Sequence, residues 1–446
     1  MRRIIIKEAR PGMRAARAVA DPGHPDAPCV PSGDILTMAQ IIQMHELGTY
    51  DLWINDPGLE FFDDVCSSQP TTAQLRLAEA LRDSFLRLSA HISRTVFRRY
   101  EIILAELIHS LTRSAPSVPC FVALTEDPAL LAHSCDTCAV ASLLGLQLET
   151  YLIDQRRRLS CRQARDILNL ALGALFHDIG ELMLPAHQRE SKLDFSASND
   201  PTGDAFGEAW KQHTDEGFAA VQGRLDPSAA VVVQHHHQHF DGSGFGIRAS
   251  GQSVAERAAR PGARPHKDKY TGAKTGGAAV AAPPKAPMGQ SGTSIHVYTR
   301  IATMADIFCH LLYAGDARIP QPVIKTLFAL QQAPLRKWFD PIVLQALLAL
   351  VPPFSEGTVV MLNDRQQAVV TKLDPNFPCC PQVRMLGSRE QIAELQLEGV
   401  ARGGISMATS AEVRLADSPG VEIAAADGAD VSEFLYGPRP GRTLAA

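Results

Sequence analysis

The sequence has no surplus of basic residues. Its 43 Lys and Arg residues are outnumbered by 48 Asp and Glu residues, which gives a formal net charge of −5. Proteins that bind nucleic-acid polymers or anionic membrane surfaces usually carry a basic surplus, so the composition argues against both classes. It still permits a small anionic ligand that is held in a local pocket.

Long apolar runs are also absent. The N-terminus offers only Ile4–Ile6 before charge returns at Lys7, whereas a signal peptide needs about 7–15 apolar residues. The longest run, Ile167–Phe176, is shorter than the roughly 20 residues that span a bilayer. The nine cysteines are scattered, and the lone Cys135/Cys138 pair is better interpreted as buried thiols than as a redox or zinc site. We therefore expect a cytoplasmic protein with reduced thiols and no membrane insertion.

The chain is long enough for two or three domains, since 446 residues compare with about 150 per domain. Residues 1–70 mix short apolar runs with turn signals such as Pro11-Gly12, which indicates a small N-terminal β-containing domain. Residues 71–116 contain apolar residues at helical spacing and no Gly or Pro between Thr72 and Arg113, which predicts a connecting amphipathic helix, or two. The apolar stripe of this segment is either core or the seam of a homodimer.

The remainder divides into a helical part and a β part. Residues 117–353 are expected to be mostly helical, interrupted by a flexible, basic, Gly/Pro/Ala-rich insertion at 248–294. In 354–446, short alternating apolar runs after Gly357 predict a β-hairpin appendage, and roughly the last 20 residues are expected to be a frayed tail. The predicted fold class is mainly α, with a helical bundle, a small β-containing N-terminal domain and a short β appendage at the C-terminus.

Histidine is unusually frequent in the helical part. Eight of the 15 histidines fall between His133 and His239. A single buried histidine is more often a hydrogen-bonded core residue than a ligand. Here, however, several histidines occur with carboxylates near expected helix ends, and Asp306 lies inside an apolar stretch. Imidazoles and carboxylates without clustered thiols suit iron or manganese better than structural zinc, and two such ions would form a phosphoester-cleaving centre.

The order of these motifs resembles the HD-GYP family, a branch of the HD-superfamily phosphohydrolases that hydrolyses the bacterial second messenger cyclic di-GMP. The resemblance covers roughly residues 117–353 and implies a helical HD-superfamily bundle with two divalent metal ions, iron or manganese. Asp178 would bridge the ions and act in catalysis with His177. The metal ligands that the resemblance implies are His133, His177, Asp178, His213, His236, His237 and Asp306.

Several positions depart from the family pattern. Glu181 stands where the family usually has a phosphate-contacting lysine, and the signature Gly-Tyr-Pro is Gly244-Phe245-Gly246. Ala129 replaces a glutamate that binds a third metal in some members, so we expect two ions. Gly242, Gly244 and Phe245 are the candidate substrate-binding residues, and Lys267 and Lys269 of the insertion are expected to replace part of the lost positive charge.

The resemblance therefore implies a phosphodiesterase that converts cyclic di-GMP to pGpG or GMP and is slowed by Glu181. The alternative is a weak or inactive module that senses the nucleotide or binds a protein. A diguanylate cyclase of the GGDEF type, or another signalling protein, would be the partner of either form.

Overall fold

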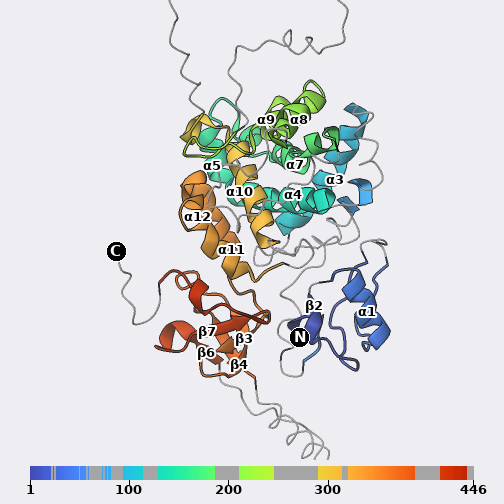
Figure 1. The fold of residues 1–446 in the computed structure, drawn as a ribbon, viewed down its shortest axis with the longest axis vertical. Coiled ribbons are helices and arrows are strands. Elements are labelled where there is room, and N and C mark those ends of the chain that lie inside the picture. Colours follow the sequence, from blue (N-terminus) through green and yellow to red (C-terminus); the bar gives the residue numbers. More distant parts are fainter. Residues whose placement is uncertain are drawn as a thin grey trace, which may run out of the picture.

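Helices form the middle of the chain and β-strands form its two ends (Figure 1). The structure is a computed structural model. It describes residues 1–21, 24, 27–49, 51–56, 59, 73, 76–77, 79–81, 94–113, 129–185, 210–245, 290–313, 320–386 and 412–438. Lys267, Lys269 and nearly all of the basic insertion lie outside these residues. The mainly α fold class with small β-sheets near both ends is confirmed.

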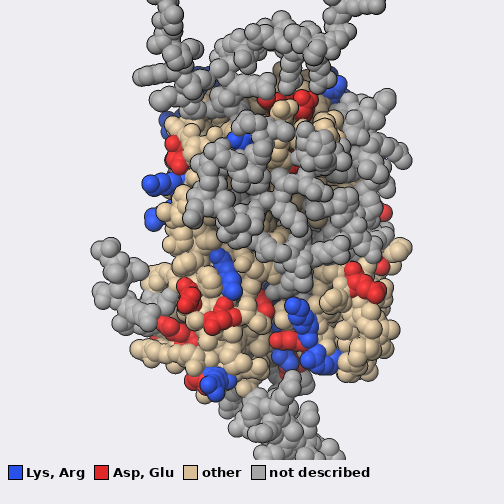
Figure 2. All heavy atoms as spheres, in the orientation of Figure 1, with Lys and Arg blue, Asp and Glu red and all other residues tan. Residues whose placement is uncertain are grey.

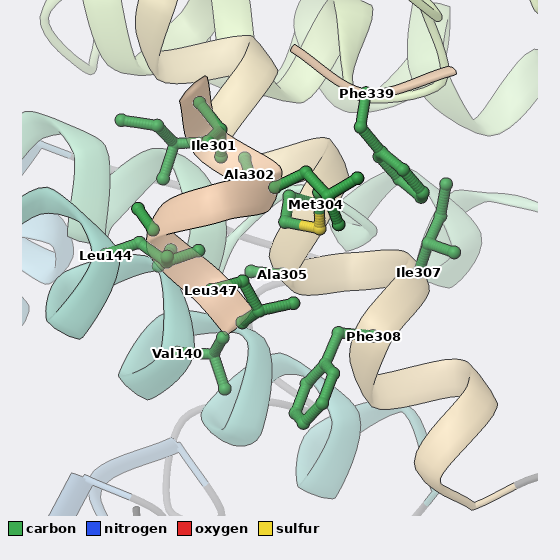
Figure 3. Close-up of a cluster of buried hydrophobic side chains, with 14 of the residues drawn as sticks. Val140, Leu144, Ile301, Ala302, Met304, Ala305, Ile307, Phe308, Phe339 and Leu347 are labelled. Carbon is green, nitrogen blue, oxygen red and sulfur yellow. The ribbon is translucent and has the colours of Figure 1, made fainter. Parts of the chain in front are cut away.

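The helical part surrounds one almost completely buried helix, α10. All but one of its 16 residues are buried, and they pack most extensively against α4. Figure 3 shows Ile301, Met304 and Phe308 meeting side chains of α4 and α12 in the core. A helix that is buried on all sides lies at the centre of its domain. The helices of this part are α3 (Arg94–Arg113), α4 (Ala129–Gln147), α5 (Glu149–Gln155), α6 (Cys161–Ala164), α7 (Leu168–Leu175), α8 (His213–Val221), α9 (Pro227–His235), α10 (Val297–Leu312), α11 (Val323–Leu330) and α12 (Pro341–Leu350).

A buried ion pair fixes α10 against its neighbours. Arg300 of α10 donates to Asp340, which also accepts a hydrogen bond from the Tyr151 hydroxyl of α5 at 2.6 Å. Asp340 in addition caps α12 by accepting from the amide of Ile342. Because Arg300 and Asp340 are both buried, removal of either would leave an uncompensated charge. The pair therefore holds α10 in place two turns before Asp306.

The apolar stripe of α3 belongs to the core. Phe97, Tyr100, Leu104 and Leu107 are fully buried in a cluster that also contains residues of α4, α7 and α9. Of the two interpretations left open by the sequence, core is the one that these residues support. Among the helices that the structure describes, none combines the length and the apolar character needed to cross a membrane.

The C-terminal β region is larger than the expected hairpin. It is a six-stranded antiparallel sheet in the order β6-β5-β4-β3-β7-β8. The expected frayed tail is wrong for residues 427–438, because Val431 and Leu435 are buried in the core of this sheet. The strands are β3 (Val359–Leu362), β4 (Gln367–Lys372), β5 (Gln382–Met385), β6 (Glu412–Arg414), β7 (Ile423–Ala426) and β8 (Ala429–Asp430).

The two ends of the chain meet in one body, which we call the terminal module (the described residues of 1–59 and 354–438). Its N-terminal part pairs β1 (Arg2–Ile5) with β2 (Asp51–Ile54) and adds α1 (Met38–Glu46). The amide of Arg3 donates to the carbonyl of Gly357 at 2.9 Å, and the Arg3 guanidinium contacts both Asp51 and Asp427 at 3.0 Å. The two β regions, expected as separate units, therefore lie side by side below the helices (Figure 1).

Basic and acidic side chains are interspersed over the described surface of the terminal module on the face drawn in Figure 2.

The terminal module contacts the helical part through α11. Ile324 of α11 belongs to the core of the six-stranded sheet, whereas Leu327 and Leu330 belong to the helical core. One short helix thus joins the two bodies.

Candidate metal centre

The clustered histidines and carboxylates come from five helical segments. His133 lies within α4 and Asp306 within α10, whereas the others stand at helix boundaries. α7 is mostly apolar and ends just before His177-Asp178, which lead into the short 3-10 helix η3 (Ile179–Met183). Each boundary places one or two ligand candidates near the same interior point.

Local sequence sets where these boundaries fall. α9 begins at Pro227, and the side chain of Asp226 caps it by accepting from the amide of Ser228. Its last residue is His235, so His236 and His237 follow directly in the turn. His213 is the first residue of α8, after the short 3-10 helix η5 (Trp210–Gln212).

All seven ligand candidates from the sequence lie together. One group of potential ligand atoms comprises His133, His177 and Asp178, and another comprises Asp178, His213, His236 and His237; in each group the atoms lie within 4.8 Å of one another. Asp306 joins the first group, since its Oδ1 is 3.0 Å from His133 Nε2 and 3.7 Å from His177 Nε2.

Asp178 lies between the two groups and offers a different oxygen to each. Its Oδ2 is 3.2 Å from His177 Nε2 and 3.9 Å from His133 Nε2. Its Oδ1 is 3.1 Å from His236 Nε2 and 3.4 Å from His213 Nε2. A carboxylate in this position could bind one cation with each oxygen.

Main-chain carbonyls fix three of the imidazole rings. Nδ1 of His177 lies 2.8 Å from the carbonyl of Ala174, and His213 and His236 make the same contact with the carbonyl three residues earlier. A carbonyl only accepts, so each Nδ1 carries a proton and each Nε2 points inward, where it offers a lone pair to a cation whenever the ring is neutral. This is the ring orientation that metal-bound histidines show.

The inward-pointing Nε2 atoms of the histidines lie close together in two pairs. His133 Nε2 is 3.2 Å from His177 Nε2, and His213 Nε2 is 3.2 Å from His236 Nε2. Two lone pairs at this distance repel unless a cation or a proton lies near both. Among the described residues, buried atoms without a hydrogen-bond partner include His237 Nε2, Asp178 Oδ1 and Asp306 Oδ2. Such atoms need an explanation, and a bound cation supplies one.

The pKa values of the clustered side chains are shifted by burial and by their charged neighbours. Burial lowers the pKa of His133 and His213 to about 4, so these rings are neutral donors at pH 7. Burial opposes ionisation of Asp178, but His177 and its other neighbours hold the pKa of Asp178 well below its usual value. Conversely, burial disfavours charge on His177, yet Asp178 and Asp306 raise its pKa in the metal-free chain. The donor set of imidazoles and carboxylates fits iron, manganese or a similar divalent ion.

One residue of the cluster was missed by the sequence analysis. His310 lies one turn after Asp306 on α10, and its Nε2 is 3.1 Å from Asp306 Oδ1. His133, Asp306 and His310 form a third group of potential ligand atoms. The signal in the sequence was the spacing of four residues between Asp306 and His310, which puts both on one helix face.

The candidate substrate loop lies directly beside the histidines. Gly242 and Gly244 have φ of 86° and 90°, and a Cβ at Gly244 would stand 2.1 Å from the carbonyl oxygen of His237. Glycine is therefore required by the backbone at position 244. The Phe245 ring stacks on the His237 ring with centroids 4.5 Å apart. The structure gives these residues a role in shaping the loop, and their contact with substrate stays a prediction.

Glu181 is held by a neighbouring aromatic side chain. The indole Nε1 of Trp210 donates to Glu181 Oε1 at 2.7 Å. In the metal-free chain, burial raises the pKa of Glu181 to about 8, and Asp178 adds to the shift. Bound divalent cations would act in the opposite direction. Glu181 is thus engaged by hydrogen bonding beside the cluster.

Other polar candidates have structural explanations. His239 is buried, stacks on Trp338 at 3.9 Å and contacts the Ser243 hydroxyl at 2.9 Å. Cys135 and Cys138 are buried and belong to no disulfide among the described residues, as the sequence indicated. Lys267 and Lys269 of the basic insertion lie outside the described residues, so their expected contribution of positive charge stays a prediction.

Comparison with known families agrees with this geometry. Residues 130–309 match the model of the HD domain family, a range that contains every ligand candidate from His133 to Asp306. No curated protein matches the chain. Residues 130–309 are therefore similar to the HD domain, the domain of a family of metal-dependent phosphohydrolases.

Proposed function

We propose that the protein is a metal-dependent phosphodiesterase that hydrolyses cyclic di-GMP to linear pGpG, with GMP as a further product. The observation that carries the proposal is Asp178, whose two oxygens face two separate groups of imidazoles. This arrangement suits a pair of divalent cations rather than one. The identity of the substrate is inferred from the sequence motifs, because their order resembles that of the HD-GYP branch of the family.

The proposed division of labour follows from the contacts. Two divalent cations, when bound, supply a water of lowered pKa and positive charge for the phosphate oxygens. Asp178 holds the two groups in register, and the carbonyl of Ala174 keeps the His177 ring turned inward. Phe245, stacked on His237, forms an apolar wall where a base or a ribose of the substrate would lie.

Glu181 stands in place of the family lysine and affects how well the site would bind a phosphodiester. A free carboxylate beside the site would repel a phosphodiester. The hydrogen bond that Trp210 donates to Glu181 reduces that repulsion. The positive contact of the family lysine is nevertheless absent, so we expect slow turnover.

The second candidate is a sensor that binds metal and nucleotide without cleaving it. The position of Glu181 favours this candidate. Glu181 accepts a hydrogen bond from Trp210 at the position where the lysine of the family would contact a phosphate. In that case the centre would serve as a binding platform, and a signalling protein would read the bound state.

A first experiment tests the centre through Asp178. The full chain is purified with iron or manganese, and metal content and cyclic di-GMP turnover are measured for the wild type and for Asp178→Ala. Because both groups share this carboxylate, we expect loss of bound metal and a fall in turnover of at least about 10²-fold. Asp154→Ala, which removes a half-exposed carboxylate of α5, should retain both properties.

The possible outcomes separate the candidates. Metal binding and nucleotide binding without turnover would support the sensor. Turnover of another nucleotide in place of cyclic di-GMP would keep the phosphohydrolase and change its substrate. Full turnover by Asp178→Ala would overturn the proposed centre.

A further inference from the structure

His310 is the exception in an otherwise buried helix. Every other residue of α10 is buried, whereas the His310 side chain is 23% exposed. Asp306 and His310 are separated by one helical turn and project from the same face. That face is the one that α10 turns toward His133 of α4, so His310 lies at the edge of the cluster.

Three donor atoms converge at this edge. Oδ1 of Asp306 is 3.0 Å from His133 Nε2 and 3.1 Å from His310 Nε2. The rings of His133 and His310 lie against each other, with centroids 3.9 Å apart and an angle of 30° between their planes. The stacking restricts rotation of both rings, so the two Nε2 atoms stay near the same carboxylate.

We propose that His310 is an additional protein ligand of the ion held by His133 and Asp306. This inference rests on the metal centre of the proposed function. It assigns five donor residues to one side of Asp178 against four on the other, counting Asp178 on both sides. The first side then comprises His133, His177, Asp178, Asp306 and His310. With this additional imidazole, the ion on the His310 side is held more tightly than its neighbour.

The competing role for His310 is positioning. Its Nε2 could donate a hydrogen bond to Asp306 and orient that carboxylate without touching the ion. The two roles differ in what a glutamine would preserve. A glutamine side chain still offers an N–H donor, but it replaces the imidazole nitrogen with an amide oxygen, which is a weaker donor than imidazole toward a later divalent ion such as Co²⁺.

The test compares metal affinities of the full chain by chelator competition, with Co²⁺ as the probe. For a ligand, we expect His310→Gln and His310→Ala each to weaken one of the two ions by about 10–100-fold and to leave the other unchanged. His109→Ala, which removes an exposed imidazole of α3, is the matched control and should bind both ions like the wild type. Retention of both affinities by His310→Gln would assign His310 to positioning and overturn the inference.

A spectroscopic variant covers the case in which a substitution disturbs folding. His310→Cys loaded with Co²⁺ should show a thiolate-to-cobalt charge-transfer absorption that the cobalt-loaded wild type lacks. Full cobalt loading without that band would overturn the inference. A wild type that binds no metal would instead defeat the proposed centre as a whole, so the two failures are distinguishable.

Discussion

Main-chain carbonyls orient three imidazoles of the centre. Each of His177, His213 and His236 is held from behind by the carbonyl three residues earlier. This contact arises wherever a histidine ends or begins a helical turn with its ring folded back along the chain. The ring then loses little rotational freedom when an ion binds, which favours affinity.

Asp136, a buried carboxyl outside the proposed ligand set, lies one turn from His133 on α4. It is 3% exposed, and burial raises its pKa to about 8, with a smaller opposing effect from Tyr313. The unfolded chain releases this proton near the usual pKa of 3.8, whereas the folded chain keeps it. Folding therefore binds a proton between these values, and the free energy of unfolding falls as the pH rises from about 4 to about 8.

Asp136→Asn should remove this pH dependence, because an amide does not ionise. At pH 8 we expect the variant to be more stable than the wild type by on the order of a few kcal/mol, and the difference should shrink toward pH 4. Urea denaturation across this range measures it. Glu106→Gln, which removes an exposed carboxyl of α3, controls for the loss of one charge. Parallel stability curves for the wild type and Asp136→Asn would show that Asp136 is ionised in the folded chain.

At the scale of elements, the centre depends on how closely η3 approaches α8. A Cβ added at Gly180 would lie 1.8 Å from the carbonyl oxygen of His213 and 2.6 Å from the amide nitrogen of Gly217. Both are main-chain atoms, so no side chain can move aside. The absence of a side chain at Gly180 is thus what allows His213 to lie beside Asp178.

Gly180→Ala should push α8 away from η3. We expect a loss of stability of about 1–3 kcal/mol, accompanied by weaker binding of the ion near His213. Gly223→Ala is the comparison, because its Cβ would meet no atom within 4 Å, although its φ of 72° is strained for alanine. Both variants should be less stable, but only Gly180→Ala should lose metal in chelator competition. Equal metal retention would mean that this close approach is dispensable for the centre.

At the scale of the whole molecule, the two ends of the chain stabilise each other. Arg3 is the main polar link, since its guanidinium lies between Asp51 and Asp427 and its side chain is 18% exposed. Gly357 allows the Trp53 ring to approach the six-stranded sheet, where a Cβ would stand 2.4 Å from that ring. A β-hairpin alone is marginally stable in water, so β1 and β2 gain much from this contact.

Arg3→Met should weaken the terminal module. The two carboxylates would lose their shared cation, and we expect the free energy of unfolding to fall by about 1–3 kcal/mol. Limited proteolysis should then cut the N-terminal residues sooner. Arg165→Met, which breaks an exposed pair with Glu149, should change stability by no more than about 0.5 kcal/mol. A similar small effect from both substitutions would show that apolar contacts alone hold the ends together.

Much of this molecule follows from local sequence signals. The helical middle and the β character of the ends were predictable, because helix periodicity and helix boundaries depend on neighbours in the chain. The seven ligand candidates were instead implied by the resemblance of their motifs to a known family. The burial of the α3 stripe was left open, since an apolar face is equally compatible with a core and with a dimer seam. The extent of the C-terminal sheet was underestimated, because β7 is rich in alanine and gives a weak strand signal.

The sequence by itself determined which side chains could bind a metal and in what order they occur. Tertiary structure alone decided that Asp178 turns one oxygen to each group, that His310 joins His133 and Asp306, and that Arg3 meets Asp427. The physical reason is one of range. Propensity, capping and periodicity act over a few residues, whereas the position of His133 relative to His310 is set by how α4 packs against α10.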